Sequence, residues 1–287
     1  MKKFGPIILA VIITVFTFAM KMLGFIQFKT PPLVEGPKVM FFVPLPQVMH
    51  DFPFAMKIAE GSYGFPVTIT VISTWCVMLF LIFIFRWSSQ NLEITPGKKQ
   101  AFFETLYAFF DALIGQMLGS WKKKYFTYIS TLFLFILISN ILSFFPIPGF
   151  SYENGILIAP ALRTPTADLN TTVGLALVTT YSFMAASFRV SGFFGFFKGL
   201  FEPMPLMFPI NLAGEFAKPT NISIRLFGNM FAGMVILGLL YKAAPVLIPA
   251  PMHLYFDLFS GIVQSFVFIM LTMVYIQGSI GDAEYLD

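Results

Sequence analysis

Long apolar runs, separated by short polar or proline- and glycine-rich stretches, dominate the pattern of this chain. A helix needs about 20 mostly apolar residues to cross a bilayer. Five or six runs meet this length, at residues 4–28, 66–85, 125–145, 169–188, 205–241 and 252–277. The last two exceed the length of an upright crossing. The pattern therefore predicts an all-α membrane protein with five to six hydrophobic helices, the last two long and tilted or kinked.

The first run has two interpretations. It follows a basic start, Lys2 and Lys3, and contains a weak small-x-small cleavage signal at residues 17–19, as a signal peptide would. It is equally compatible with an uncleaved membrane anchor. We divide the chain into a signal or anchor segment with an external loop, residues 1–66, and a membrane domain, residues 67–287. The stretches 30–66 and 146–165 are rich in proline and glycine and are predicted to be loops.

Residues 98–119 differ from the membrane runs because apolar side chains recur there at spacings of three and four. The repeating positions are Phe102, Leu106, Phe109, Phe110, Leu113 and Met117. This spacing predicts an amphipathic helix that lies along the cytoplasmic surface or packs on a neighbouring helix. The Trp-Lys-Lys-Lys sequence at 121–124 is expected to anchor the next crossing at the lipid headgroups.

Composition supports a membrane setting. The chain is 57% hydrophobic and 11% charged, with 38 phenylalanines, whereas soluble domains carry about 25% charged residues. The net charge is +4, but the basic residues cluster in short loops, which fits membrane topology better than nucleic-acid binding. With the amino terminus inside, ten Lys and Arg residues fall on the cytoplasmic side and six on the outer side. We expect both termini in the cytoplasm and a bacterial plasma (inner) membrane.

One arginine, Arg225, lies inside the fifth run. A guanidinium keeps its proton near neutral pH, and a charge at the bilayer centre costs about 3 kcal/mol or more. On a helix, Lys218, Asn221, Arg225 and Asn229 fall near one face, and Gly228 leaves little bulk beside them. This polar, shallow stripe favours a functional site approached by another helix, although helix–helix contact within this chain is an alternative.

The last run has a weaker polar stripe of Asp257, Gly261 and Gln264, spaced four and three residues apart. Gln264 can offer a donor and an acceptor to Arg225 if the two helices face each other. Asp257 is interpreted either as a receiver of a hydrated cation or proton near the outer end, or as an interfacial carboxylate. His253 is expected at the interface, and a His–Asp metal pair there is disfavoured.

Three further polar residues have open interpretations. Asp168 and Asn170 start the fourth run, where they either cap a helix or belong to the site. Glu215 either lines an inner water path or is exposed at the interface. The chain has no phosphate-binding loop, nucleophile elbow or metal motif, and one cysteine, Cys76. We therefore expect no catalysis, cofactor, metal or disulfide within the chain.

Three stretches, at residues 209–233, 165–177 and 264–276, closely resemble subunit a of the membrane Fo sector of ATP synthases. They cover the carboxyl-terminal two thirds in the right order, and the Arg-Leu-Phe-Gly-Asn core around Arg225 is highly specific. The resemblance implies a stator beside a rotating ring of c subunits, with two offset aqueous half-channels that carry H+ or Na+ to and from the ring carboxylates. It also implies b subunits of the peripheral stalk, the soluble ATPase head and the lipid bilayer as partners, and no nucleic acid.

The resemblance assigns the essential arginine to Arg225, the facing glutamine to Gln264 and the asparagine one turn on to Asn229. The full set of residues that we expect to serve ion translocation is Arg225, Gln264, Asn229, Asp257, Lys218, Glu215, Asp168 and Asn170. Two positions depart from many proton-type members, which carry Glu where this chain has Met234 and His where it has Asp257. These departures put the familiar proton relay in doubt and leave sodium possible.

Two other classes of function were weighed. A secondary transporter for an anionic substrate bound at Arg225 would transport by itself and would usually show an inverted repeat, and no repeat is evident. An intramembrane enzyme needs a nucleophile–base pair or a metal dyad within the spans, and the sequence shows neither.

Overall fold

The computed structural model describes residues 39–44, 56–59, 62–90, 93–94, 96–142, 151–153, 156–158, 164–202, 204–243 and 249–281. In these ranges, five helical stretches are long and apolar enough to cross a membrane: Ile69–Ser88, Lys98–Ile141, Leu169–Gly199, Pro205–Leu240 and Pro251–Ile280. They correspond to the predicted runs after residue 66, and the second also contains the amphipathic segment. The predicted first run, residues 4–28, lies outside the described residues.

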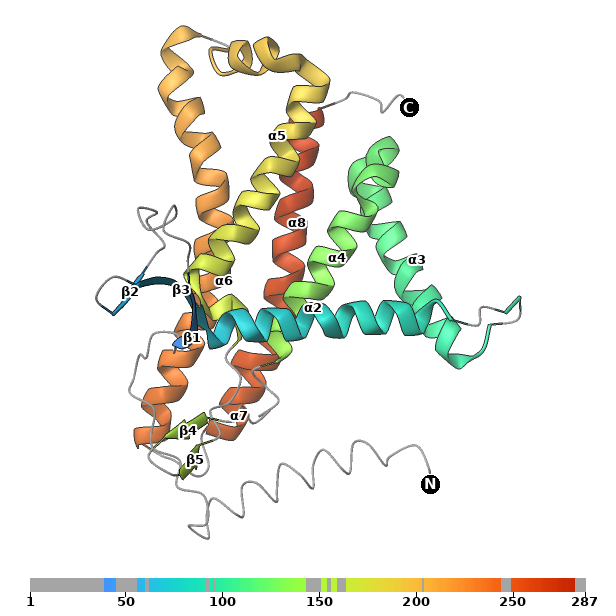
Figure 1. Ribbon diagram of the computed structural model, residues 1–287. Coiled ribbons are helices and arrows are strands. Elements are labelled where there is room, and N and C mark those ends of the chain that lie inside the picture. The colour runs from blue at the N-terminus through green and yellow to red at the C-terminus, as the bar shows by residue number, and fades with distance from the viewer. Residues whose placement is uncertain are drawn as a thin grey trace.

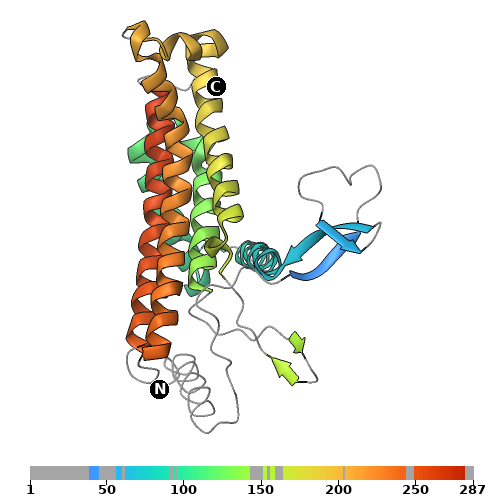
Figure 2. The same cartoon turned by 90° about the vertical axis from the view of Figure 1, so that its left-hand side faces the viewer.

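Four helices run side by side as the body of the molecule (Figures 1 and 2). They are α4 (Lys122–Ile141), α5 (Leu169–Gly199), α6 (Phe208–Ala243) and α8 (Ser260–Ile280). α2 (Ile69–Ser88) crosses this body, and Figure 2 shows it nearly end-on beside the other helices. The two long C-terminal segments are thus steeply inclined to α2 (Figures 1 and 2).

The amphipathic segment forms α3 (Lys98–Leu118), which is joined to α4 by a short 3₁₀ turn, Gly119–Trp121. Its buried residues Phe110, Ile114 and Leu118 follow a spacing of four and pack against α4. Packing on a neighbouring helix, one of the two predicted alternatives, is therefore confirmed. Gly119 has φ of 53°, a left-handed conformation that glycine adopts without strain, and this ends α3.

Two apolar clusters hold the helices together. One joins α3, α4, α5 and α8, with Ile129, Phe183 and Met273 at its centre. The other joins α4, α5, α6 and α8 through Ile136, Ala176, Leu226 and Phe268. On α6, Ile222 and Leu226 are buried at a spacing of four, whereas Ile224 and Arg225 are exposed beside them.

Three irregularities shape the helices. α5 bends at Gly192, where φ is 69°, so its final turns leave the direction of the body (Figure 1). α6 contains Pro219, which removes one backbone donor, yet the helix continues on both sides. Between α7 (Pro249–His253) and α8, residues Leu254–Phe259 form a π-helix, a conformation common at functional sites.

The two stretches predicted to be loops contain strands, so those predictions were incomplete. β1 (Val39–Pro44), β2 (Met56–Ala59) and β3 (Ser62–Thr68) form an antiparallel sheet in the order β1-β3-β2. β4 (Ser151–Glu153) pairs with β5 (Ile156–Ile158). The prolines and glycines obscured short runs of β-branched and aromatic residues such as those of β1, which have strand preference.

Candidate functional site

Arg225 lies on the exposed face of α6. Its neighbours Ile222 and Leu226 are buried in the core, whereas Arg225 and Ile224 are exposed. Among the described residues, no hydrogen bond or ion pair involves its guanidinium. Space is open at Gly228, since a Cβ added there would meet no heavy atom within 4 Å. The charge therefore faces outward, beside an open position on the helix, and no described residue supplies a counter-charge.

Asn229 and Gln264 occupy the contact between α6 and α8. The Asn229 Oδ1 accepts a hydrogen bond of 2.8 Å from the Ser260 hydroxyl, and its Nδ2 is buried without a partner in the described part of the chain. Gln264, one turn after Ser260 on α8, is 8% exposed, and no hydrogen bond of its amide involves a described residue. The expected hydrogen bond between Gln264 and Arg225 is not formed. In the described part of the chain, the amides of Asn229 and Gln264 thus keep unused hydrogen-bonding capacity.

A buried polar network that the sequence analysis missed lies at the same junction. Asn140 of α4 is fully buried and donates hydrogen bonds of 3.0 Å to the Gly261 carbonyl and the Ser265 hydroxyl. Its Oδ1 accepts a bond of 2.6 Å from Thr166, in the 3₁₀ turn Pro165–Ala167 before α5. The sequence signal for this network is the amide of Asn140 inside the otherwise apolar third run. Buried polar groups in membranes are costly and need partners, so such an amide indicates contacts with other helices.

Asp257 lies in the π-helix at the start of the last span. It is buried, and its Oδ2 lies 2.6 Å from Nδ1 of His253. From the sequence, His253 is expected at the interface, and no contact with Asp257 other than a disfavoured metal pair is considered. The structure instead pairs the two, because the residues are four apart on one helical face. No group of three or more His, Cys, Asp or Glu able to hold a metal occurs among the described residues.

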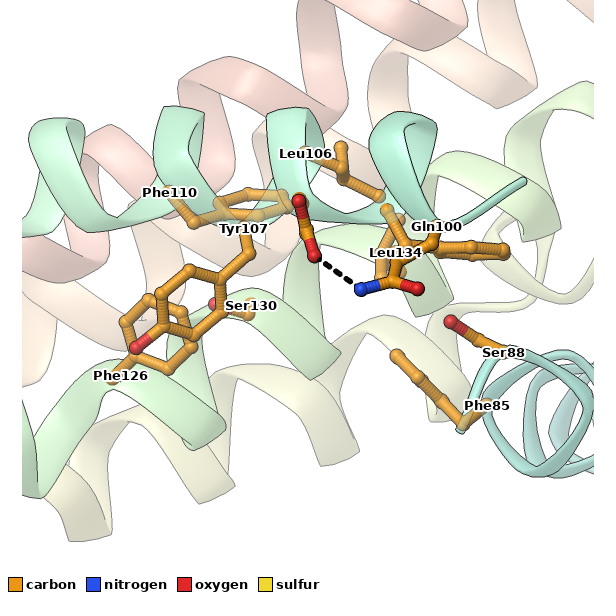
Figure 3. Close-up of a pocket in the computed structure, with 11 residues that line it drawn as sticks. Phe85, Ser88, Gln100, Leu106, Tyr107, Phe110, Phe126, Ser130 and Leu134 are labelled. Carbon is orange, nitrogen blue, oxygen red and sulfur yellow. Dashed lines mark hydrogen bonds between the residues drawn. The ribbon is translucent and has the colours of Figure 1, made fainter. Parts of the chain in front are cut away.

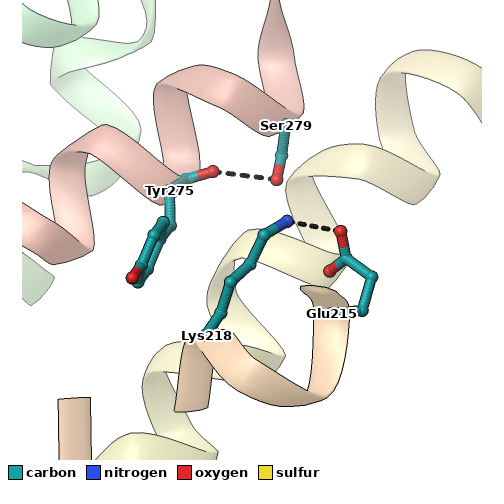
Figure 4. A network of polar contacts seen from close by, with 4 residues as sticks. All are labelled: Glu215, Lys218, Tyr275 and Ser279. Atoms are coloured by element: carbon teal, nitrogen blue, oxygen red, sulfur yellow. Dashed lines mark hydrogen bonds and ion pairs between the residues drawn. The ribbon is translucent and has the colours of Figure 1, made fainter. Parts of the chain in front are cut away.

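Lys218 and Glu215 are three residues apart on α6 and form an ion pair, beside Tyr275 and Ser279 of α8 (Figure 4). The Lys218 ammonium also lies 5.2 Å from the centre of the Phe183 ring on α5. Asn221 donates to the Tyr275 hydroxyl at 3.3 Å. Of the cations in the predicted stripe, Lys218 therefore pairs with an acid of the chain. Arg225 pairs with no residue that the structure describes.

Asp168 and Asn170 lie at the start of α5. Asp168 caps this helix, because its Oδ1 accepts from the backbone N–H of Asn170 at 3.0 Å. Its Oδ2 accepts from the Thr70 hydroxyl at 2.9 Å, which connects α5 to α2. Asn170 is exposed. The capping alternative is thus confirmed for Asp168, and no contact in the described chain joins either residue to Arg225.

Comparison with known proteins agrees with this geometry. The sequence pattern of the family described as ATP synthase A chain matches residues 71–277. The chain is 84% identical over 288 residues, covering 100% of both chains, to "ATP synthase subunit a, sodium ion specific" of Propionigenium modestum. It is 34% identical over 211 residues, 74% of this chain and 90% of the relative, to ATP synthase subunit a of Moorella thermoacetica. The subunit a of Gloeobacter violaceus is 35% identical over 218 residues, 75% of this chain and 85% of that protein.

Matches of this extent establish the relationship, and five helices of spanning length agree with it. The chain belongs to the ATP synthase A chain family, and it is a multi-pass membrane protein of the ion-translocating stator of the Fo sector.

Proposed function

We propose that this stator subunit carries sodium ions through two aqueous half-channels to and from the carboxylates of a c-subunit ring, with Arg225 between the channels. The observation that supports this role is the state of Arg225, which is exposed on a spanning helix and lacks a counter-charge among the described residues. Holding such a charge in a bilayer costs about 3 kcal/mol or more unless a partner or water compensates it. A carboxylate on a neighbouring subunit supplies that compensation.

The electrostatic consequence is twofold. A fixed guanidinium repels any cation moving directly from one half-channel to the other. It also stabilises the ring carboxylate while that carboxylate is empty, so that the bound ion leaves. Asn229 and Gln264, with their unused amide groups, are suited to hydrate or hand over an ion beside Arg225. The open space at Gly228 allows a ring helix to approach α6 closely.

Sodium is favoured over protons by two observations. The relative that is 84% identical is named sodium ion specific. Asp257 and Met234 replace the His and Glu that many proton-type members use, and Met234 cannot exchange a proton. Asp257 is proposed to receive the ion on the outer side, and Glu215 with Lys218 to line the inner route. Asp168 and Asn170 make no contact with Arg225 in the described chain, and Asp168 has a structural role as the cap of α5.

The remaining assignments follow from the family. The partners are the c ring, the b subunits of the peripheral stalk and, through the complex, the soluble ATPase head. Membership of this family disfavours the alternative function, which is secondary transport of an anionic substrate bound at Arg225. We place the protein in a bacterial plasma membrane with both termini in the cytoplasm, because that orientation leaves most basic loop residues inside.

Replacement of Arg225 by Ala tests the proposal. In the assembled complex in liposomes, we expect sodium-driven ATP synthesis to fall by roughly 100-fold, since losing one member of a desolvated ion pair costs about 3 kcal/mol. The matched control is Arg189→Ala, an exposed arginine near the end of α5 that has its own contacts in the chain. Sodium uptake and ATP synthesis are measured on the same vesicles. Coupled synthesis that survives in Arg225→Ala would contradict the role of Arg225, and synthesis independent of sodium in the unmodified complex would contradict the choice of ion.

A further inference from the structure

A cavity of about 390 Å³ lies where α2, α3 and α4 diverge, near the C-terminal end of α2 (Figure 3). It is far along α2 from Thr70, which bonds to the Asp168 cap. Its walls are largely aromatic and aliphatic and include Phe85, Phe103, Tyr107, Phe110, Phe126 and Leu134. None of the residues discussed for ion translocation lines this cavity, and no part of the described chain fills it.

Polar groups are confined to parts of this cavity. Near α2 its edge has Ser88, Gln100 and Glu104, and Gln100 donates a 2.7 Å hydrogen bond to the Glu104 carboxylate (Figure 3). Along the wall formed by α4, the Ser130 hydroxyl is buried without a hydrogen-bond partner among the described residues. A buried unpaired hydroxyl is costly. An apolar body with a few polar groups is the pattern of a site for an amphiphile.

Two exposed cations lie close in sequence to the polar edge. Arg86 follows the lining residue Phe85, and Lys98 precedes the lining residue Gln100 by two positions. Both are exposed, and no ion pair with a described residue involves either. The third cation, Lys99, is already bonded to the Trp87 carbonyl. Glu93 and Glu104 are the acids nearby, and Glu104 is engaged by Gln100. The surplus of positive charge favours an anionic group at this end.

We propose that the cavity binds one acyl chain of a membrane phospholipid whose phosphate pairs with Arg86 and Lys98. Its volume lies in the range of small-ligand sites, about 300–1,000 Å³. In the predicted orientation this lipid belongs to the cytoplasmic leaflet. It fills the space between α2 and the α3–α4 pair and so fixes their angle.

A photoreactive lipid tests the site in the assembled complex. The complex is reconstituted in phosphatidylethanolamine–phosphatidylglycerol liposomes that contain phosphatidylglycerol with a diazirine in the middle of one acyl chain. After illumination, labelled residues are mapped by mass spectrometry. We expect cavity residues such as Phe110 and Phe126 to be labelled several-fold more than Leu79 and Phe83, which are 66% and 67% exposed on α2 and report contact with bulk lipid.

Variants separate a bound lipid from chance contact. Ser130→Phe fills the cavity and should reduce labelling of Phe110 to the level of Leu79. Arg86→Gln and Lys98→Gln should each reduce it about fivefold, the effect of one basic residue near an anionic headgroup. Lys123→Gln, in the first turn of α4, should not. The charge variants lie at the surface and remain decisive if Ser130→Phe fails to assemble. Labelling of the cavity no higher than Leu79, labelling unchanged by the charge variants, or cross-links from the cavity to another protein subunit would each overturn the proposal.

Discussion

Two glycines of the site differ in what surrounds them, and the difference predicts the effects of adding a methyl group. A Cβ at Gly261 would lie 3.0 Å from the Cβ of Asn140, whereas a Cβ at Gly228 would meet nothing within 4 Å. We expect Gly261→Ala to lower the free energy of unfolding by about 1–3 kcal/mol through overpacking. Gly228→Ala should leave it unchanged or raise it by up to about 1 kcal/mol, because alanine favours helix. Thermal unfolding of the purified subunit in detergent measures both.

The same pair distinguishes contacts inside the subunit from contacts with a partner. If Gly228 gives room to a ring helix, Gly228→Ala should reduce sodium-driven ATP synthesis in the complex although the isolated subunit stays stable. Equal destabilisation of the isolated subunit by both substitutions would show that the surface around Gly228 is packed within the chain, contrary to this structure.

At the level of single residues, the sequence could predict the helical face but not the pairing on it. The spacing of Lys218, Arg225 and Asn229 places them near one face of α6, because positions on one helix follow from its period. It could not tell that Lys218 is matched by Glu215 and Arg225 by no described residue. Asn140 was missed because its partners lie 121 and 125 residues away along the chain, and no local pattern reports such contacts.

At the level of elements, Asn140 joins α4 to α8 and to the turn before α5, and its loss should loosen this junction. Interhelical hydrogen bonds in membrane proteins contribute about 0.6 kcal/mol each on average, so loss of all of these bonds in Asn140→Leu should cost about 2 kcal/mol. The neighbouring Ser139 is a matched control, since its hydroxyl is buried without a partner among the described residues. Ser139→Ala should be neutral or stabilising.

Thermal unfolding, together with hydrogen exchange of α8, measures the effect of Asn140→Leu. The exchange should rise around Gly261 and Ser265, where the lost bonds ended, and less at Ile276 in the apolar cluster. Unchanged stability in Asn140→Leu, or an equal loss in Ser139→Ala, would show that the network does not hold the junction.

Elements were predictable to the extent that their patterns are local. Every apolar run after residue 66 became a helix of spanning length, because run length and hydropathy decide this. The direction of those helices was not predictable, since the crossing of α2 over the body depends on side-chain packing between distant segments. The strands β1, β2 and β3 were missed because strand pairing is non-local and proline is rare in strands, yet Pro66 lies within β3.

At the scale of the whole molecule, exposure alone does not separate a surface that faces lipid from one that faces a partner subunit. Ile224 on α6 is 59% exposed and Leu177 on α5 is 58% exposed. An open glycine lies near each of them, Gly228 and Gly174. Only Ile224 lies beside a charge that no described residue pairs, a feature that a lipid-facing surface should not retain. The proposed function therefore requires a second protein to contact this surface along α6.

Cysteine cross-linking distinguishes these two surfaces in the assembled complex. After Cys76, which is exposed, is replaced by Ser, Ile224→Cys should form a disulfide with a cysteine placed on the outer helix of the c subunit. Leu177→Cys should not, despite its equal exposure, because α5 is expected to face lipid. The yield is measured by electrophoresis after mild oxidation, and Leu226→Cys, fully buried in the core, gives the background. Cross-linking from Leu177 at the yield of Ile224 would place the ring elsewhere, and the charge of Arg225 would then need a different partner.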